Sequence, residues 1–173
     1  MNIVLIGMSG SGKTTVGNIL ARKLGRELVE MDVLIARRAG MSIPEIVASH
    51  GWAQFRDIEA ELTPAVSRRN NAIISAGGGV VTRENNIKQL KKNGELVWLN
   101  ASLDSLLERI GQDAGRPPLV SGRSQREDMA LTLAERESLY RKAADFTVDT
   151  EHKTPEAVAE EIIGFLQEEA TDG

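Results

Sequence analysis

The sequence predicts an α/β protein with three layers, α/β/α, around a five-stranded and mostly parallel sheet. Short apolar segments alternate with longer segments of helical periodicity, which is the pattern of repeated β–α units. A glycine-rich loop joins the first apolar segment to the first helical one. No internal repeat or shift in composition divides the 173 residues, so we expect a single domain.

Each expected strand is a short run of mostly apolar residues. The first, from Ile3 to Ile6, is wholly apolar, as suits a parallel strand buried on both faces. The second ends in acidic residues, and the third runs into three consecutive glycines. In chain order the expected strands are residues 3–6, 27–32, 72–75, 96–99 and 146–148.

Helical spacing and capping residues define the segments between the strands. Ser42 and Glu45 have the spacing of a capping box with Pro44 in the first turn, and Gly51 interrupts that helix. Gly94 is the expected C-terminal cap of the helix that precedes it. In chain order the expected helices are residues 14–24, 42–62 with the interruption, 83–93, 102–109, 126–144 and 155–169.

The composition is that of an ordinary globular protein, with 41% hydrophobic and 27% charged residues. A net charge of −4 provides no basic surplus for nucleic acid. The absence of cysteine excludes disulfides, thiolate metal sites and cysteine nucleophiles, and two histidines are too few for a histidine metal cluster. There is no signal-peptide pattern and no apolar run near the roughly 20 residues of a membrane span. We therefore expect a cytoplasmic protein without nucleic-acid or membrane partners.

A phosphate-binding loop is the most specific motif. Residues 7–14 read Gly-Met-Ser-Gly-Ser-Gly-Lys-Thr, a complete G-x-x-x-x-G-K-T pattern between a strand and a helix. Gly10 and Gly12 can take backbone angles that direct N–H groups at phosphate oxygens, and the helix N-terminus adds positive charge. Lys13 is expected to reach the β- and γ-phosphates and the Thr14 hydroxyl to bind Mg²⁺. The loop predicts a triphosphate site. It does not distinguish a kinase from an ATPase or a GTP-driven switch.

One segment lacks any periodicity. Residues 111–125 contain three glycines, two prolines and the arginines Arg116 and Arg123. A structureless segment of this length inside a small domain is usually a linker or a mobile functional loop.

Acidic residues and the glycine run are expected opposite the phosphate loop, since ligands gather at the carboxyl ends of parallel strands. Glu30 and Asp32 could hold magnesium through water or accept a proton from an attacking hydroxyl. Asp32 could instead cap a helix, and Glu30 could be an exposed strand-end charge. The run Gly77–Gly79 indicates close approach of a ligand to bare backbone, with a tight turn as the alternative.

Taken in order, six motifs resemble those of the shikimate kinase family over nearly the whole chain. They are Gly7 to Thr15, Asp32, Phe55-Arg56, Ser75-Ala76-Gly77-Gly78-Gly79, Arg116-Pro117 and Arg136-Glu137-Ser138-Leu139-Tyr140. Val148-Asp149-Thr150 with Pro155 also resembles the family's adenine-side loop. The resemblance implies one P-loop kinase domain over residues 1–173, with an acceptor-binding segment at about 33–60 and a lid at about 111–126.

The resemblance further implies transfer of the γ-phosphoryl group of ATP to the 3-hydroxyl of shikimate, by a monomer that uses Mg²⁺. The implied catalytic residues are Asp32, Lys13 and Arg116, with Thr14 and, through water, Glu30 at the metal. The implied shikimate-binding residues are Asp32, Arg56, Gly77, Gly78, Gly79 and Arg136. The implied nucleotide-binding residues are Gly10, Ser11, Gly12, Lys13, Thr14, Thr15, Arg109, Arg116 and Pro155.

Several of these residues also have plainer interpretations. Guanidinium groups suit the shikimate carboxylate, yet Arg56 could be a solvated helix residue paired with Glu59 or Glu61. Arg136 could pair in the same way with Asp128 or with the glutamate just before it. Arg109, implied to pack on adenine, could be a charged residue of a helix's last turn. The aromatic residues at positions 52 and 55 are expected in the core.

The chain departs from the family pattern in three places. Glu30 stands where the family usually has an aspartate, Ala36 where an acidic residue is common, and Pro118 follows Arg116-Pro117 where the family has leucine. Rival functions are another small-molecule kinase, for gluconate or nucleoside monophosphates, and a nucleotide-dependent switch. The chain has few aromatic residues to stack on a nucleotide acceptor and no N-K-x-D element for guanine.

Overall fold

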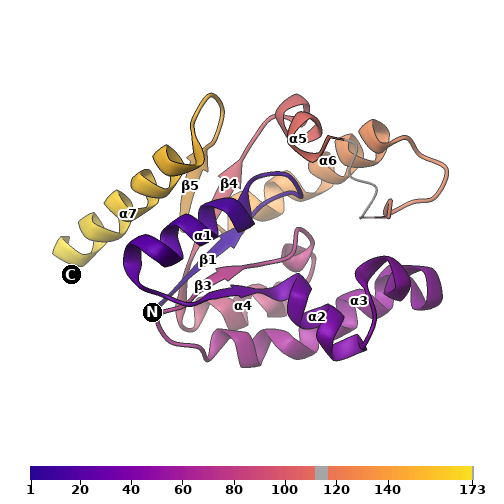
Figure 1. Cartoon of the computed structure of the whole chain (residues 1–173), viewed down its shortest axis with the longest axis horizontal. Helices are drawn as coiled ribbons and strands as arrows, with labels where there is room; N and C mark the ends of the chain where they lie inside the picture. Colours follow the sequence, from indigo (N-terminus) through magenta and orange to yellow (C-terminus); the bar gives the residue numbers. More distant parts are fainter. Residues whose placement is uncertain (112–116, 173) are drawn as a thin grey trace.

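A single sheet of five strands runs through the centre of the protein in the order β2-β3-β1-β4-β5 (Figure 1). The computed structural model describes residues 1–111 and 117–172. All five expected strands are present, and their pairings are all parallel in the described part of the chain. The strands are β1 (Asn2–Ile6), β2 (Leu28–Glu30), β3 (Ile73–Ser75), β4 (Gly94–Asn100) and β5 (Phe146–Asp149).

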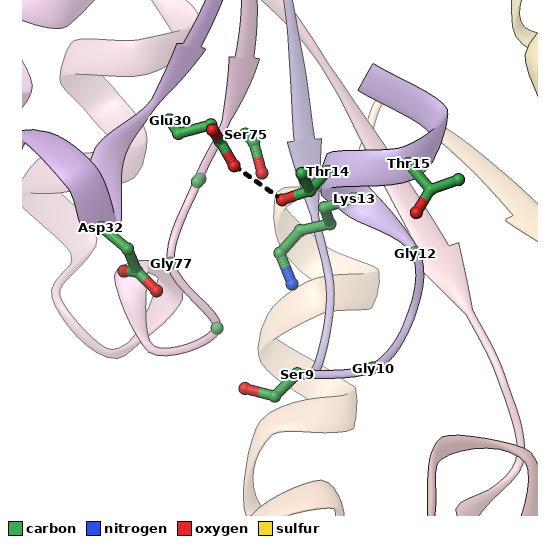
Figure 2. Close-up of a pocket in the computed structure, with 12 residues that line it drawn as sticks. Ser9, Gly10, Gly12, Lys13, Thr14, Thr15, Glu30, Asp32, Ser75 and Gly77 are labelled. Carbon is green, nitrogen blue, oxygen red and sulfur yellow. Dashed lines mark hydrogen bonds between the residues drawn. The ribbon is translucent and has the colours of Figure 1, made fainter. Parts of the chain in front are cut away.

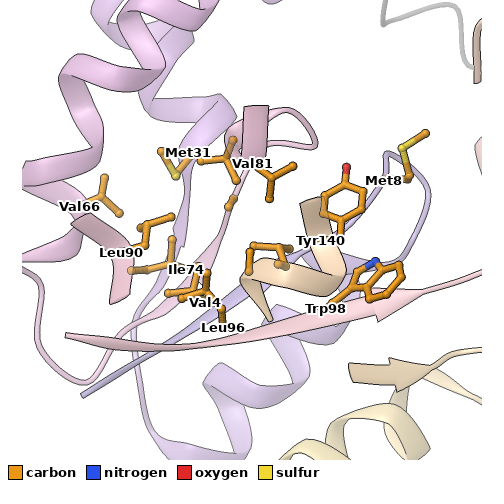
Figure 3. Close-up of a cluster of buried hydrophobic side chains, with 14 of the residues drawn as sticks. Val4, Met8, Met31, Val66, Ile74, Val81, Leu90, Leu96, Trp98 and Tyr140 are labelled. Carbon is orange, nitrogen blue, oxygen red and sulfur yellow. The ribbon is translucent and has the colours of Figure 1, made fainter. Parts of the chain in front are cut away.

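Helices cover both faces of the sheet and confirm the three layers (Figure 1). The helices are α1 (Lys13–Leu24), α2 (Met31–Ala39), α3 (Ile43–Ser67), α4 (Glu84–Lys91), α5 (Leu103–Ile110), α6 (Gln125–Ala143) and α7 (Pro155–Asp172), with a 3₁₀ turn η1 (Val80–Thr82). Helices α1 and α7 pack on one face of the sheet. Helices α3, α4 and α6 pack on the other, and Figure 3 shows the buried side chains of that face.

Strand alternation divides the core into two clusters. Successive side chains of a strand point to opposite faces of a sheet. On β1, Ile3 and Leu5 therefore join the cluster under α1 and α7, whereas Val4 and Ile6 join the cluster on the other face. Because β1 is buried on both faces, it holds the loop that follows it in a fixed position.

Helices α2 and α3 enclose a third, separate cluster. It consists of Ile35, Ile46, Phe55 and Ile58, with Trp52 packed at its margin. The predicted burial of the aromatic residues is confirmed for Phe55, which is fully buried, and Trp52 is half-buried. This cluster gives the segment between β2 and β3 a small core of its own.

The expected capping box and helix break are confirmed, whereas the expected end of the second strand and the expected cap at Gly94 were wrong. The capping box of Ser42 and Glu45 is formed, and Gly51 breaks helical geometry inside α3 with φ 79° and ψ 172°. The second strand ends at Glu30, so Asp32 lies in the first turn of α2, a helix that was not expected. Gly94 caps no helix but begins β4, where a Cβ would lie 2.9 Å from Val4 Cγ2.

Among the described residues, no helix is both long enough and apolar enough to cross a membrane.

Candidate active site

The phosphate loop connects β1 to α1 and has the backbone that its glycines predict. Gly10 and Gly12 have φ values of 84° and 98°, and α1 begins directly afterwards at Lys13. The Lys13 ammonium group donates to the carbonyl oxygens of Gly7 at 2.7 Å and of Met8 at 2.9 Å. The lysine is buried and lies along the inside of the loop, next to the N–H groups of the first helical turn.

Gly10 also allows α5 to pack against the loop. A Cβ on this residue would lie 2.7 Å from Ile110 Cγ1 and 3.0 Å from the carbonyl oxygen of Leu106. The phosphate loop is therefore in contact with the helix that leads into the expected lid.

A cavity of about 300 Å³ lies between the phosphate loop and the ends of β2 and β3. Lys13 and Thr14 line one side, and Glu30, Asp32 and Gly77 line the other (Figure 2). The Thr14 hydroxyl donates to Glu30 Oε1 at 2.9 Å. The structure thus brings together the predicted phosphate-binding, metal-binding and hydroxyl-accepting groups at one edge of the sheet.

Two glycines of the run after β3 make room for side chains of α3, and at the third a Cβ would make only ordinary contacts. A Cβ on Gly77 would lie 2.7 Å from Glu59 Oε2 and 3.2 Å from Asp32 Oδ1, and one on Gly79 would lie 2.1 Å from Arg56 Cζ. A Cβ on Gly78 would lie 3.5 Å from an Arg136 nitrogen and from the carbonyl oxygen of Gly7. The tight turn expected as the alternative is also present, since the Gly77 carbonyl oxygen accepts the Val80 N–H at 3.1 Å. None of the three glycines has a positive φ, so the turn does not itself require glycine, and side-chain packing explains the residue choice at Gly77 and Gly79.

A second cavity, of about 650 Å³, adjoins the first at Ser9 and Gly10 of the phosphate loop. Its lining includes Arg56 of α3, Arg136 of α6 and the segment 117–119. The two predicted carboxylate-binding arginines therefore face one space, although 80 residues separate them in the sequence.

Arg56 pairs with Glu59, as one plainer interpretation anticipated, but this pair is not solvated. Arg56 Nη1 lies 3.0 Å from Glu59 Oε1, and the exposed fractions of the two side chains are 11% and 0%. A buried carboxylate that holds a guanidinium group in this way orients it. Glu59 was expected only as one possible partner of a solvated Arg56, and its i+3 spacing from that arginine was the available signal.

Arg136 has neither of its anticipated partners. It is 9% exposed, and no carboxylate among the described residues pairs with it. Asp128 instead accepts the backbone N–H groups of Leu119 at 3.1 Å and Val120 at 3.3 Å. A buried guanidinium group that borders a cavity without an acidic partner is suited to an anionic ligand.

Tyr140 is a further residue whose role the sequence left open. Its hydroxyl donates to the carbonyl oxygen of Gly78, and its ring stacks on Trp98 of β4 with centroids 5.8 Å apart. Because Tyr140 is one turn beyond Arg136 on α6, this bond fixes the glycine run relative to that arginine.

The loop between β5 and α7 is attached to α5. Arg109 donates to the hydroxyl oxygen of Thr150 at 3.0 Å and to its carbonyl oxygen at 3.3 Å. At the other end of α5, Glu151 accepts the Ser102 N–H and the Ser105 hydroxyl. These hydrogen bonds, with that of the Ser102 N–H contributing most, hold the pKa of Glu151 below its usual range.

The remaining predicted residues lie at the margins of this arrangement. Thr15 lines the first cavity, Ser11 is buried within the loop, and Pro155 begins α7. Arg116 lies outside the described residues.

These features define a class: a P-loop kinase whose phosphate loop borders two adjoining cavities, one of them lined by two buried arginines. A family model of shikimate kinase matches residues 9–167. Among curated proteins, a shikimate kinase of Thermodesulfovibrio yellowstonii is 45% identical over 94% of this chain and 92% of its own length. One of Symbiobacterium thermophilum is 38% identical over the full length of both.

Solved structures of shikimate kinases have the same fold as this chain. A shikimate kinase from Acinetobacter baumannii in complex with shikimate superposes with a TM-score of 0.92 at 33% identity, covering 97% of this chain and 93% of the other. The enzyme from Aquifex aeolicus gives 0.84 at 36% identity over all of both chains. The chain belongs to the shikimate kinase family and is an ATP-dependent phosphotransferase.

Proposed function

We propose that the protein transfers the γ-phosphoryl group of ATP to the 3-hydroxyl of shikimate, with the residue roles given below. The observation that carries this proposal is the pair of adjoining cavities. One contains the phosphate loop and Asp32, and the other contains the buried arginines Arg56 and Arg136. A small molecule with a carboxylate at one end and a hydroxyl at the other would span the two.

On the donor side, the loop N–H groups and the start of α1 bind the phosphates, and Lys13 neutralises charge on the transferring group. Thr14 and Glu30 would hold Mg²⁺. Their hydroxyl and carboxylate oxygens suit this hard cation, which keeps water and phosphate ligands, and the described residues contain no larger cluster of acidic or histidine ligands. When bound, the ion would shield the charges of the phosphate oxygens.

On the acceptor side, Arg56 and Arg136 bind the carboxylate, and Asp32 accepts a hydrogen bond from the 3-hydroxyl. That hydroxyl oxygen forms a bond to the γ-phosphorus while the bond from the γ-phosphorus to the bridging oxygen of ADP breaks. The hydroxyl proton passes to Asp32 and from there to solvent. The N–H groups of Gly77–Gly79 add contacts to the ring hydroxyls.

The remaining residues bind the adenine or cover the site. Arg109 and Pro155 flank the adenine, and Arg116, on a lid at about 111–126, neutralises the transferring phosphoryl group. Residues 33–60 form the acceptor-binding segment. We further propose that the enzyme acts as a cytoplasmic monomer.

The acceptor can be identified by the ADP that purified protein releases with ATP and Mg²⁺. Shikimate, gluconate, CMP and no acceptor are compared side by side, and we expect rapid release with shikimate alone. Turnover with gluconate or CMP but not with shikimate would refute the proposed acceptor.

Two substitutions separate the roles of the residues. Arg56→Ala should raise the KM for shikimate about 10- to 100-fold and leave that for ATP nearly unchanged, since it removes a charge-assisted contact to the carboxylate. Asp32→Asn should lower kcat about 100-fold or more. Arg68→Ala, at an exposed position at the end of α3 and outside the acceptor-binding segment, serves as the control and should behave like the parent. A loss of ATP affinity in Arg56→Ala would contradict its assignment.

A further inference from the structure

Residues 117–120, here called the acceptor strap, are the part of the proposed lid (about 111–126) that forms part of the wall of the second cavity. Pro117, Pro118 and Leu119 line it together with Arg56 and Arg136. The loop that contains the strap extends from α6 toward the end of the molecule where α3 lies (Figure 1). The strap belongs to no helix or strand in the described structure, so side chains must fix its position.

Two side chains from opposite sides attach the strap. From α3, the Trp52 indole N–H donates to the carbonyl oxygen of Pro118 at 3.0 Å. From α6, the two carboxylate oxygens of Asp128 accept the N–H groups of Leu119 and Val120. Three consecutive strap residues are thus bonded to two helices that contribute the carboxylate-binding arginines.

Trp52 also contacts Arg56, one of the two arginines proposed to bind the carboxylate. The Arg56 guanidinium carbon lies 5.5 Å from the centroid of the Trp52 ring, within the range of a cation–π contact. The same ring meets Phe55 edge to face at 5.2 Å, which anchors it on the buried α2–α3 cluster. The Trp52 side chain therefore fixes the positions of both Arg56 and the strap.

We propose that Trp52 and Asp128 are positioning residues that hold the acceptor strap against the carboxylate-binding arginines and thereby set affinity for the acceptor. This inference rests on the proposed function, because it takes the second cavity as the acceptor site. Trp52 is not among the residues that line the cavity, whereas Asp128 borders it and acts through the two strap N–H groups that it accepts. Loss of either attachment releases the strap, widens the cavity and weakens acceptor binding without altering the nucleotide site.

The test uses Trp52→Phe, which keeps a ring beside Arg56 and deletes the N–H, and Asp128→Asn, which leaves one acceptor oxygen. Phenylalanine also weakens the cation–π contact with Arg56, whereas Asp128 holds the strap from the other side, on α6. The same effect in both variants would therefore be attributed to the strap, which they share. Asp104→Asn is the matched control, since Asp104 is exposed, pairs with Arg126, and neither residue is among those that line the cavity.

Two measurements are made on the full-length protein. First, the KM for shikimate should rise about 3- to 10-fold in both variants, as expected for one lost hydrogen bond, while the KM for ATP stays within about twofold. Second, trypsin should cleave faster after Arg123, the exposed arginine that follows the strap, with no change after the exposed Arg68 and Arg69. Asp104→Asn should match the parent in both.

Unchanged cleavage after Arg123 would show that the two residues do not hold the strap and would overturn the proposal. Faster cleavage with an unchanged acceptor KM would overturn it as well, since the strap would then have no part in binding. If the parent protein used gluconate or CMP in place of shikimate, the proposed function would fail. The strap would then be tested by its cleavage and by the KM of that acceptor.

Discussion

Gly79 shows how a missing side chain can position a charged one. The Arg56 guanidinium group occupies the space where a Cβ of residue 79 would stand, and its partner Glu59 occupies the corresponding space at Gly77. The glycine run thus provides the space that the Arg56 guanidinium group and its partner Glu59 occupy. This residue-level fit also explains why Arg56 can be largely buried and still border a cavity.

A methyl group at position 79 should displace Arg56. We expect Gly79→Ala to raise the KM for shikimate about 10-fold or more and to destabilise the fold by about 1–3 kcal/mol, because a Cβ would lie 2.1 Å from Arg56 Cζ. Steady-state kinetics and urea unfolding measure the two effects. In Gly164→Ala a Cβ meets nothing within 4 Å inside α7, so this control should be up to about 1 kcal/mol more stable. Parental acceptor affinity in Gly79→Ala would contradict the steric argument.

At the scale of elements, local signals predicted what short segments decide by themselves. The phosphate loop, the capping box at Ser42 and the break at Gly51 follow from backbone and capping chemistry within a few residues. Helix α2 was not predicted, because it begins directly after β2, with no turn residue between them and no side-chain cap at Glu30. The role of Trp52 depends on a contact with the distant residue Pro118, which no local pattern specifies. The i+3 spacing of Glu59 from Arg56 indicated a pair, but the burial of that pair depends on packing against other elements.

The start of β4 offers a test of element-level electrostatics. Burial, together with the negative charges of Asp145 and Glu169, raises the pKa of Glu95 above its usual range, against the opposing effect of Lys91. A carboxyl group with a raised pKa binds its proton more readily in the folded than in the unfolded chain. Its contribution to stability therefore falls as the pH rises from below 4.5 toward neutrality.

Glu95→Gln should therefore stabilise the protein at pH 7, and the gain should vanish below the ordinary pKa of glutamate. Because solvent screens much of the repulsion, we expect a gain under about 0.5 kcal/mol. Thermal unfolding of parent and variant across this pH range measures it. Glu151→Gln is a control of opposite sign: its lowered pKa means that the substitution destabilises at neutral pH and becomes neutral in acid. A gain at acid pH only would refute the argument for Glu95.

At the scale of the whole molecule, the two halves of the site rest on cores of different size. The phosphate loop follows β1, which is buried between the two clusters of the sheet. The proposed acceptor-binding segment, residues 33–60, rests on the α2–α3 cluster, which has four buried residues. Since less apolar surface holds α2 and the start of α3, this region should open at a lower free energy than the sheet.

Hydrogen exchange followed by mass spectrometry should detect this difference. In the free protein, we expect amides of α2 and of α3 before Gly51 to exchange faster than those of β1 and β4. Shikimate at about 100 times its Kd should slow that exchange by up to about 100-fold, because it binds only the closed segment. ADP alone should chiefly protect the phosphate loop and α1, which serves as the internal control. Equal protection of all elements by shikimate would mean that the protein opens only as a whole, and the acceptor segment would then have no independent stability.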